Sequence, residues 1–173
     1  MPLPTSEVRE LVRRLADRHV GRTEANVQSD LHMLLAAGPL DLGDEQLQDI
    51  VLESPAGQRR RIDVEVGFTV FEVKRDLRVG NVRTEAVEQL VGYVATRTTT
   101  LQQRYVGVLT DGAEWHLYSL AGNEFALVSS LEVDPKSPDV DGLECSRFFG
   151  HRIRLPTDQG QFKITIRDLC CAR

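Results

Sequence analysis

The most restrictive feature of the sequence is a pair of short segments, 60–66 and 68–75, that a single glycine separates. In the first segment apolar and polar residues alternate, which is the period of two that a β-strand imposes on its side chains. The second is mostly apolar and short enough to be a strand. We therefore expect two strands joined by a tight turn at Gly67, and a further strand at 49–53 would complete a three-stranded meander.

Helical patterns surround this meander. Apolar residues recur at helical spacing in segments 6–20, 23–37 and 84–98, with Thr84 as the expected N-cap of the third helix. Further strands are expected at 105–110, 114–120 and 124–133, with a hairpin turn at Asp111-Gly112. This order of helices and strands predicts an α/β fold.

The predicted elements fill residues 1–133, which we interpret as one domain. Residues 39–48 read as a loop or a short helical turn. Residues 134–142 are rich in Pro, Asp and Gly and indicate a linker. Residues 143–173 are then a C-terminal appendage, or the opening of a larger protein.

Composition narrows the class of protein. Of the 173 residues, 41% are hydrophobic, which is enough for one core, and no apolar run is long enough to cross a membrane. Three cysteines are an odd number and give a poor disulfide framework. The first residues lack the basic start and apolar run of a signal peptide, so we expect a cytoplasmic protein.

The net charge of −5 is unusual for a protein that binds nucleic acid. The basic residues are clustered, however, and the cluster reads either as a solvated edge or as a local rim that contacts phosphates. Its members are Arg59, Arg60, Arg61, Lys74, Arg75, Arg78 and Arg83.

Three charged residues of the meander point to chemistry. Glu72 and Lys74 are two residues apart on one strand and share a face, and Asp63 lies on the preceding strand where it can stand beside them. Half-buried charges are costly unless they are paired or bound to metal. Two carboxylates suit Mg²⁺, and the lysine could orient or deprotonate a water that attacks a phosphate. The chain has 18 Arg and 3 Lys among its 21 basic residues, so a lysine here is notable.

The pattern Arg-Ile-Asp, eight residues, then Glu-Val-Lys, on a meander followed by a helix, resembles the PD-(D/E)XK nuclease superfamily over about residues 22–120. Within that superfamily it resembles the N-terminal nuclease domains of type I restriction subunits. The resemblance implies a restriction-endonuclease-like core, in which a central mixed sheet is flanked by helices. It also implies a metal-dependent endonuclease that hydrolyses DNA, and a role in restriction or repair. Ile62 stands where the family has proline, which is not a ligand.

The resemblance also implies roles for four more residues. Asp63, Glu72 and the backbone carbonyl of Val73 would hold Mg²⁺, with Mn²⁺ as a substitute, and Glu24 is a further candidate ligand. We expect Glu24 to face the sheet, although it also reads as a favourable acid at a helix start. Gln89 and Tyr93 resemble a Gln-x-x-x-Tyr motif, in which Gln89 would assist near Lys74; alternatively, Tyr93 is core and Gln89 is surface.

Two other interpretations compete with the nuclease. A non-cleaving module that binds nucleic acid or regulates another protein would use the same fold without the reaction. An unrelated α/β domain with a chance Glu-x-Lys would have Asp63 and Glu72 far apart. The expected partners of the nuclease are DNA, other domains or subunits of a restriction-modification or helicase assembly, and a second copy of the chain, since a homodimer suits cutting of both strands.

Overall fold

The computed structural model describes residues 5–19, 21–37, 50–55, 61–121 and 124–136. Within these ranges the helical repeats form α1 (Thr5–Ala16), α2 (Glu24–Ala37) and α3 (Val82–Leu101). The strands are β1 (Ile50–Pro55), β2 (Arg61–Val66), β3 (Thr69–Val73), β4 (Val106–Thr110), β5 (Glu114–Ala121) and β6 (Glu124–Glu132).

The six strands form one sheet in the order β1-β2-β3-β4-β5-β6. β1, β2 and β3 pair antiparallel and are the predicted meander. β3 and β4 are parallel neighbours, because α3 carries the chain from the end of one strand to the start of the other. β5 and β6 extend the sheet with antiparallel pairs. The prediction of an α/β fold with a central mixed sheet is therefore confirmed.

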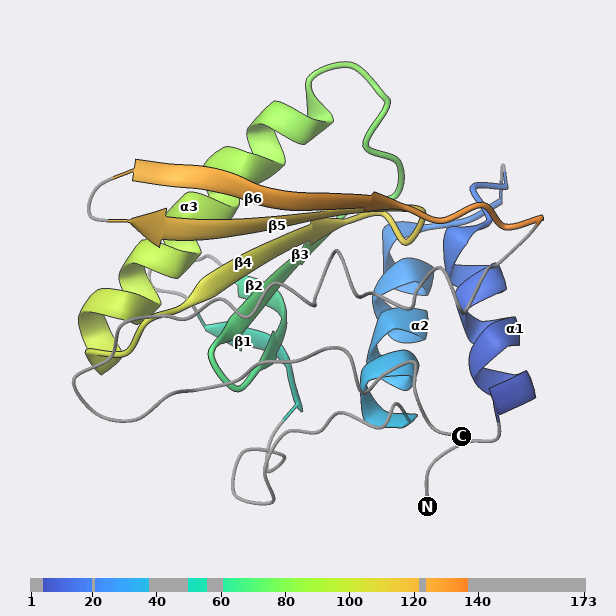
Figure 1. Cartoon of the computed structure of the whole chain (residues 1–173), viewed down its shortest axis with the longest axis horizontal. Helices are drawn as coiled ribbons and strands as arrows, with labels where there is room; N and C mark the ends of the chain where they lie inside the picture. Colours follow the sequence, from blue (N-terminus) through green and yellow to red (C-terminus); the bar gives the residue numbers. More distant parts are fainter. Residues whose placement is uncertain (1–4, 20, 38–49, 56–60, 122–123, 137–173) are drawn as a thin grey trace.

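Helices cover both faces of the sheet. α1 and α2 stand side by side on one face and α3 lies on the other (Figure 1). The core under α1 and α2 includes Leu15, Leu31, Phe71, Val73, Val108 and Trp115. The core under α3 includes Ile62, Val70, Leu90, Tyr93, Leu109 and Tyr118. Both faces of the central strands are thus buried, which is why β3 reads as an almost continuous apolar run.

Three predicted helix boundaries were wrong. α1 ends at Ala16 and not at residue 20, because the guanidinium of Arg22 donates hydrogen bonds to the carbonyls of Leu15 and Asp17 and takes the place of further helical turns. α3 begins at Val82 with Asn81 as its N-cap, before the predicted cap at Thr84, and it ends at Leu101, beyond the predicted residue 98. The ends of the strands lie within two residues of their predicted bounds.

Some predicted segments lie outside the described residues: the loop at 39–48, residues 137–142 of the linker, and 143–173. Of the helices in the described ranges, none has the length and apolar character that crossing a membrane requires.

Candidate metal and phosphodiester site

The candidate site lies at the end of the sheet where β3 and β4 finish. These strands are parallel and in register, with Val73 opposite Thr110, so their carboxyl ends meet at one edge. The N-terminal ends of α2 and α3 reach the same end of the molecule (Figure 1). Open α/β sheets commonly bind ligands at the carboxyl ends of parallel strands. The topology therefore brings Lys74, the first residue after β3, to a position where ligands are often bound.

Glu72 is deeply buried at this edge, with 2% of its surface exposed. Val70, two residues earlier, belongs to the core under α3, so the alternation of β3 directs Glu72 to that same face. Its Oε1 accepts a hydrogen bond from Lys74 Nζ at 2.6 Å. Its Oε2 is buried and has no hydrogen-bond partner in the described part of the chain. One oxygen of Glu72 therefore lacks a compensating positive group.

The charge balance of the site is unfavourable to an ionised Glu72. Burial raises the pKa of Glu72 to about 7, and the charge of Asp63 adds to this effect against the opposing contribution of Lys74. Burial alone would lower the pKa of Lys74, but its hydrogen bond to Glu72 and the nearby acids outweigh burial and hold that pKa above its ordinary value. One ammonium thus fails to balance the negative charge gathered here.

Asp63 stands beside Glu72 on the neighbouring strand. Val64 is opposite Phe71, so residues 63 and 72 come next to each other across the β2–β3 pair, and the charge of Asp63 acts on Glu72. Asp63 Oδ2 accepts a hydrogen bond from the backbone N–H of Val73 at 2.8 Å. The half-buried Asp63 carboxylate therefore lies next to the strand position that follows Glu72.

Glu24 approaches the site from the first turn of α2. Thr23 and Asn26 cap this helix reciprocally: Thr23 N–H donates to Asn26 Oδ1, and Asn26 N–H donates to Thr23 Oγ1. Glu24 Oε1 lies 3.9 Å from Lys74 Nζ, yet the Glu24 side chain is 49% exposed. The expectation that it faces the sheet and not water therefore holds only in part.

Gln89 lies on an exposed position of α3, whereas Tyr93 is buried in the core beneath that helix. No hydrogen bond joins Gln89 to Lys74. This arrangement agrees with the interpretation of Tyr93 as a core residue and Gln89 as a surface residue. A role for Gln89 in the reaction stays a prediction.

The donor set fits a magnesium ion that retains water ligands. No group of three or more His, Cys, Asp and Glu side chains within the described ranges is arranged to hold a metal ion. Magnesium commonly binds proteins through one or two carboxylates, with water and substrate phosphate filling the other positions. Asp63, Glu72 and the carbonyl of Val73 can supply that smaller set, and the unpartnered Glu72 Oε2 is the oxygen most in need of a cation.

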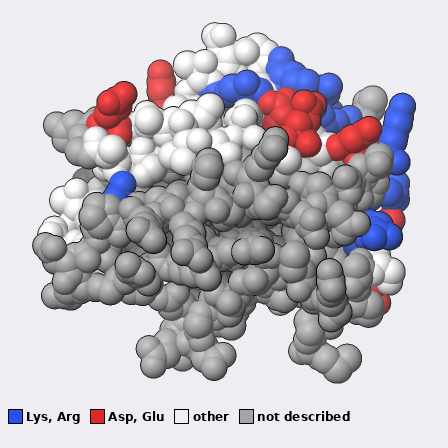
Figure 2. All heavy atoms as spheres, in the orientation of Figure 1, with Lys and Arg blue, Asp and Glu red and all other residues white. Residues whose placement is uncertain are grey.

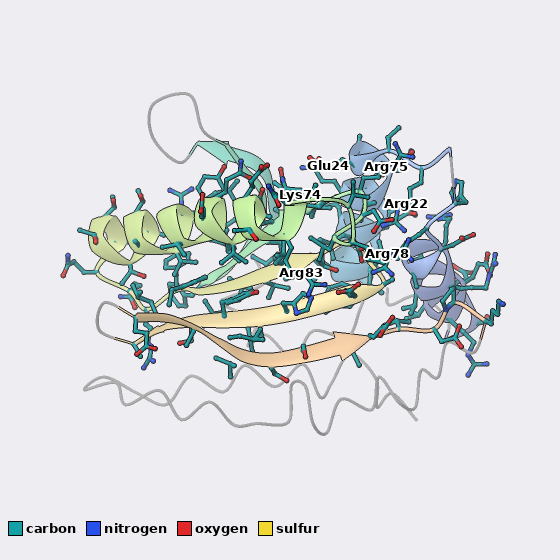
Figure 3. All side chains as sticks on the ribbon, turned by 90° about the horizontal axis from the view of Figure 1, so that it is seen from above. Arg22, Glu24, Lys74, Arg75, Arg78 and Arg83 are labelled. Carbon is teal, nitrogen blue, oxygen red and sulfur yellow. The ribbon has the colours of Figure 1, made fainter. Side chains whose placement is uncertain are left out.

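Basic side chains gather at the same end as the site. Figure 3 shows basic side chains around the starts of α2 and α3: Lys74, Arg75, Arg78 and Arg83. In Figure 2, Lys and Arg side chains lie at the upper right of the molecule, with acids among them. Arg78 pairs with Asp76 at 2.7 Å, and Arg83 pairs with Glu114. The side chains of 59–61 lie outside the description. The rim is thus partly neutralised by its own ion pairs.

Several residues that order this edge were not predicted from the sequence. Gln28 Nε2 donates to the carbonyl of Asp63 at 2.7 Å and ties α2 to β2. The sequence does contain a signal for this contact, because Gln28 follows Glu24 by four residues and therefore shares its side of α2. Arg18 and Arg22 bind the turn at Asp111, about ninety residues away, and no local pattern marks such pairs.

No family model matches the chain, and searches among curated proteins and among solved structures also found no match.

Proposed function

We propose that the chain is a metal-dependent nuclease that hydrolyses DNA phosphodiester bonds in restriction or repair, with Asp63, Glu72 and Lys74 as its centre. The observation that carries the proposal is the buried Glu72, whose Oε2 has no partner while its Oε1 holds Lys74 at 2.6 Å. The order of helix, meander, helix and strand is also the order that the PD-(D/E)XK resemblance implies.

Each residue has a distinct part in this proposal. Glu72 Oε2, Asp63 and the Val73 carbonyl would hold Mg²⁺ or Mn²⁺, and the bound ion would supply the charge that polarises the phosphate and stabilises the leaving oxygen. Lys74 donates a hydrogen bond to the attacking water or to a phosphate oxygen. The water oxygen forms a new bond to phosphorus and gives up one proton, one ester P–O bond breaks, and the leaving oxygen takes one proton, so that the products are a phosphate monoester and an alcohol.

The surroundings of Lys74 suit an extended anionic substrate. Lys74 keeps 18% of its side chain exposed, whereas Glu72 is almost fully covered. Arg75 is exposed next to it, and the loop that follows carries Arg78. These cations provide a local attraction for phosphates on a chain whose net charge is −5.

A non-cleaving module that binds nucleic acid is the second candidate. It is favoured by the absence, among the described residues, of a third side chain that would complete a metal-binding group. Such a module would bind DNA through the basic rim and would be indifferent to magnesium.

One assay distinguishes these functions. The protein is incubated with supercoiled circular DNA and with linear DNA, with and without Mg²⁺ or Mn²⁺, as wild type, Lys74→Ala and Lys136→Ala. Lys136 is the matched control because it is an exposed lysine after β6. We expect metal-dependent cuts that Lys74→Ala slows by about 100-fold or more, as loss of a donor at the reacting group does, and that Lys136→Ala leaves unchanged.

Other results decide against the nuclease. Binding without metal-dependent cuts would support the second candidate. Equal cutting by the wild type and Lys74→Ala would exclude Lys74 from the reaction. Neither binding nor cutting would leave the unrelated α/β domain as the remaining interpretation.

A further inference from the structure

A buried acid outside the proposed centre organises the chain around Lys74. Asp111 follows β4 and has no exposed surface. Its Oδ1 accepts hydrogen bonds from the N–H groups of Ala113 and Glu114, at 3.1 and 2.8 Å, which closes the β4–β5 hairpin. Arg18 donates hydrogen bonds to both carboxylate oxygens, with its Nε 2.9 Å from Oδ2. The hydrogen bonds from Arg18 are not needed to close a hairpin turn.

Further hydrogen bonds connect the end of β4 to residues 74–77, the segment that begins with Lys74. The backbone N–H of Lys74 donates to the carbonyl of Thr110 at 2.9 Å. Three residues later, the N–H of Leu77 donates to Asp111 Oδ2 at 3.0 Å. Two consecutive residues at the end of β4 therefore hold both ends of the segment 74–77.

Thr110 is itself held in place. Its Oγ1 donates to the carbonyl of Glu114 at 2.7 Å and accepts from the N–H of Gly112 at 2.8 Å. Arg22 donates to the carbonyl of Asp111 from the connection between α1 and α2. The same turn thus fixes the backbone of Lys74 and the approach to α2, from which Glu24 faces the Lys74 ammonium.

We infer that Asp111, paired with Arg18, is a positioning residue for Lys74, acting through Leu77 and Thr110. It touches neither substrate nor metal in this assignment, and the inference rests on the proposed nuclease function. A side chain that must meet a reacting phosphate tolerates little displacement, so loosening its backbone should reduce turnover more than substrate binding.

The variant Asp111→Asn tests the inference, because it keeps the shape of the side chain and removes its charge. Glu65→Gln is the matched control, because Glu65 is also buried and pairs with Arg97 at 2.7 Å. Glu65 lies near the β2–β3 turn, at the opposite end of the β2–β3 pair from Lys74. We expect Asp111→Asn to lower kcat about 10- to 100-fold with KM within about twofold, as losses of supporting contacts do. Glu65→Gln should keep the kcat of the wild type where both are folded.

Two further readouts do not depend on cleavage. Hydrogen exchange should accelerate at the amides of Lys74 and Leu77 in Asp111→Asn, more than at amides of β5. The chain has few lysines, so the Nζ signal of Lys74 can be assigned in NMR spectra by comparison with Lys74→Ala. That signal should shift toward the position of an unstructured lysine in Asp111→Asn and stay in place in Glu65→Gln.

The outcomes separate the two proposals. If the wild type does not cut DNA but the exchange and Nζ signals change as expected, the positioning role stands and the nuclease fails. If kcat in Asp111→Asn equals that of Glu65→Gln, or exchange rises uniformly over the sheet, Asp111 has a merely structural role. Should Asp111→Asn not fold, Arg18→Gln loosens the same carboxylate from its partly exposed side and takes the same readouts.

Discussion

At the residue scale, Glu72 should make the free energy of unfolding depend on pH. Folding raises its pKa from 4.5 to about 7, first through burial and then through the charge of Asp63. Between these pH values the folded protein binds more protons than the unfolded chain. The contribution of Glu72 is therefore fully present below about pH 4.5 and is lost as the pH rises toward about 7.

We predict that Glu72→Gln stabilises the metal-free protein above neutral pH. The amide keeps the size of the side chain without the buried charge, so the variant should gain on the order of 3 kcal/mol over the wild type at about pH 8. The difference should disappear near about pH 4, where Glu72 is protonated in both states. Urea unfolding of both proteins in EDTA across this range measures it.

We predict the opposite change in the free energy of unfolding for Glu65→Gln. Both acids pair with a cation, Glu65 with Arg97 at 2.7 Å and Glu72 with Lys74 at 2.6 Å, but Glu72 also faces the charge of Asp63. Removing the charge of Glu65 leaves the partly buried Arg97 uncompensated, so this variant should be less stable than the wild type at neutral pH. A loss of stability in both variants would contradict the view that Glu72 is buried without sufficient positive charge.

At the scale of elements, the β4–β5 hairpin packs closely against α1. Gly112 has φ +87°, and a Cβ added there would lie 2.0 Å from the carbonyl oxygen of Leu15 in α1. Gly67, in the β2–β3 turn, has φ +54° but nothing within 4 Å of an added Cβ. The two glycines therefore share the backbone requirement and differ in close packing.

Alanine at each position separates these two effects. Gly67→Ala should cost about 1–2 kcal/mol of unfolding free energy, the penalty of a left-handed backbone for a residue with a Cβ. Gly112→Ala should cost that amount and about 1–3 kcal/mol more, because α1 has to move away from the hairpin. Chemical unfolding of the two variants provides the comparison. Equal losses would mean that α1 is not held tightly at this turn.

The elements themselves were largely predictable, because burial imposes a period on each of them. Of the apolar stripe that predicts α2, Val27, Leu31 and Leu35 are buried and Leu34 is partly buried. Contacts between distant residues left no such pattern: Arg22 ends α1 early by binding its carbonyls, and Asp111 holds Leu77 across 34 residues. Of the candidate site, strand alternation predicted how the acids and Lys74 are grouped, whereas the exposure of Glu24 depends on how α2 meets the sheet.

At the scale of the whole molecule, the candidate site lies where the sheet meets the helix α2. β2 and β3 carry its acids, α2 contributes Glu24, and the end of β4 holds the segment after Lys74. A cation bound there would contact groups from separate elements, which come together only when the sheet and its helices are folded. Binding should therefore stabilise the folded chain as a unit.

This coupling gives a prediction that needs no DNA. The free energy of unfolding of the wild type should rise with magnesium, by about 2.7 kcal/mol when the ion is at 100 times its Kd. Glu72→Gln should lose this gain, since it replaces the oxygen that lacks a partner, while Glu65→Gln should keep it. Potassium chloride at matched ionic strength controls for screening. If magnesium stabilises Glu72→Gln as much as the wild type, the ion binds elsewhere, and the proposed metal centre is excluded whatever the result with DNA.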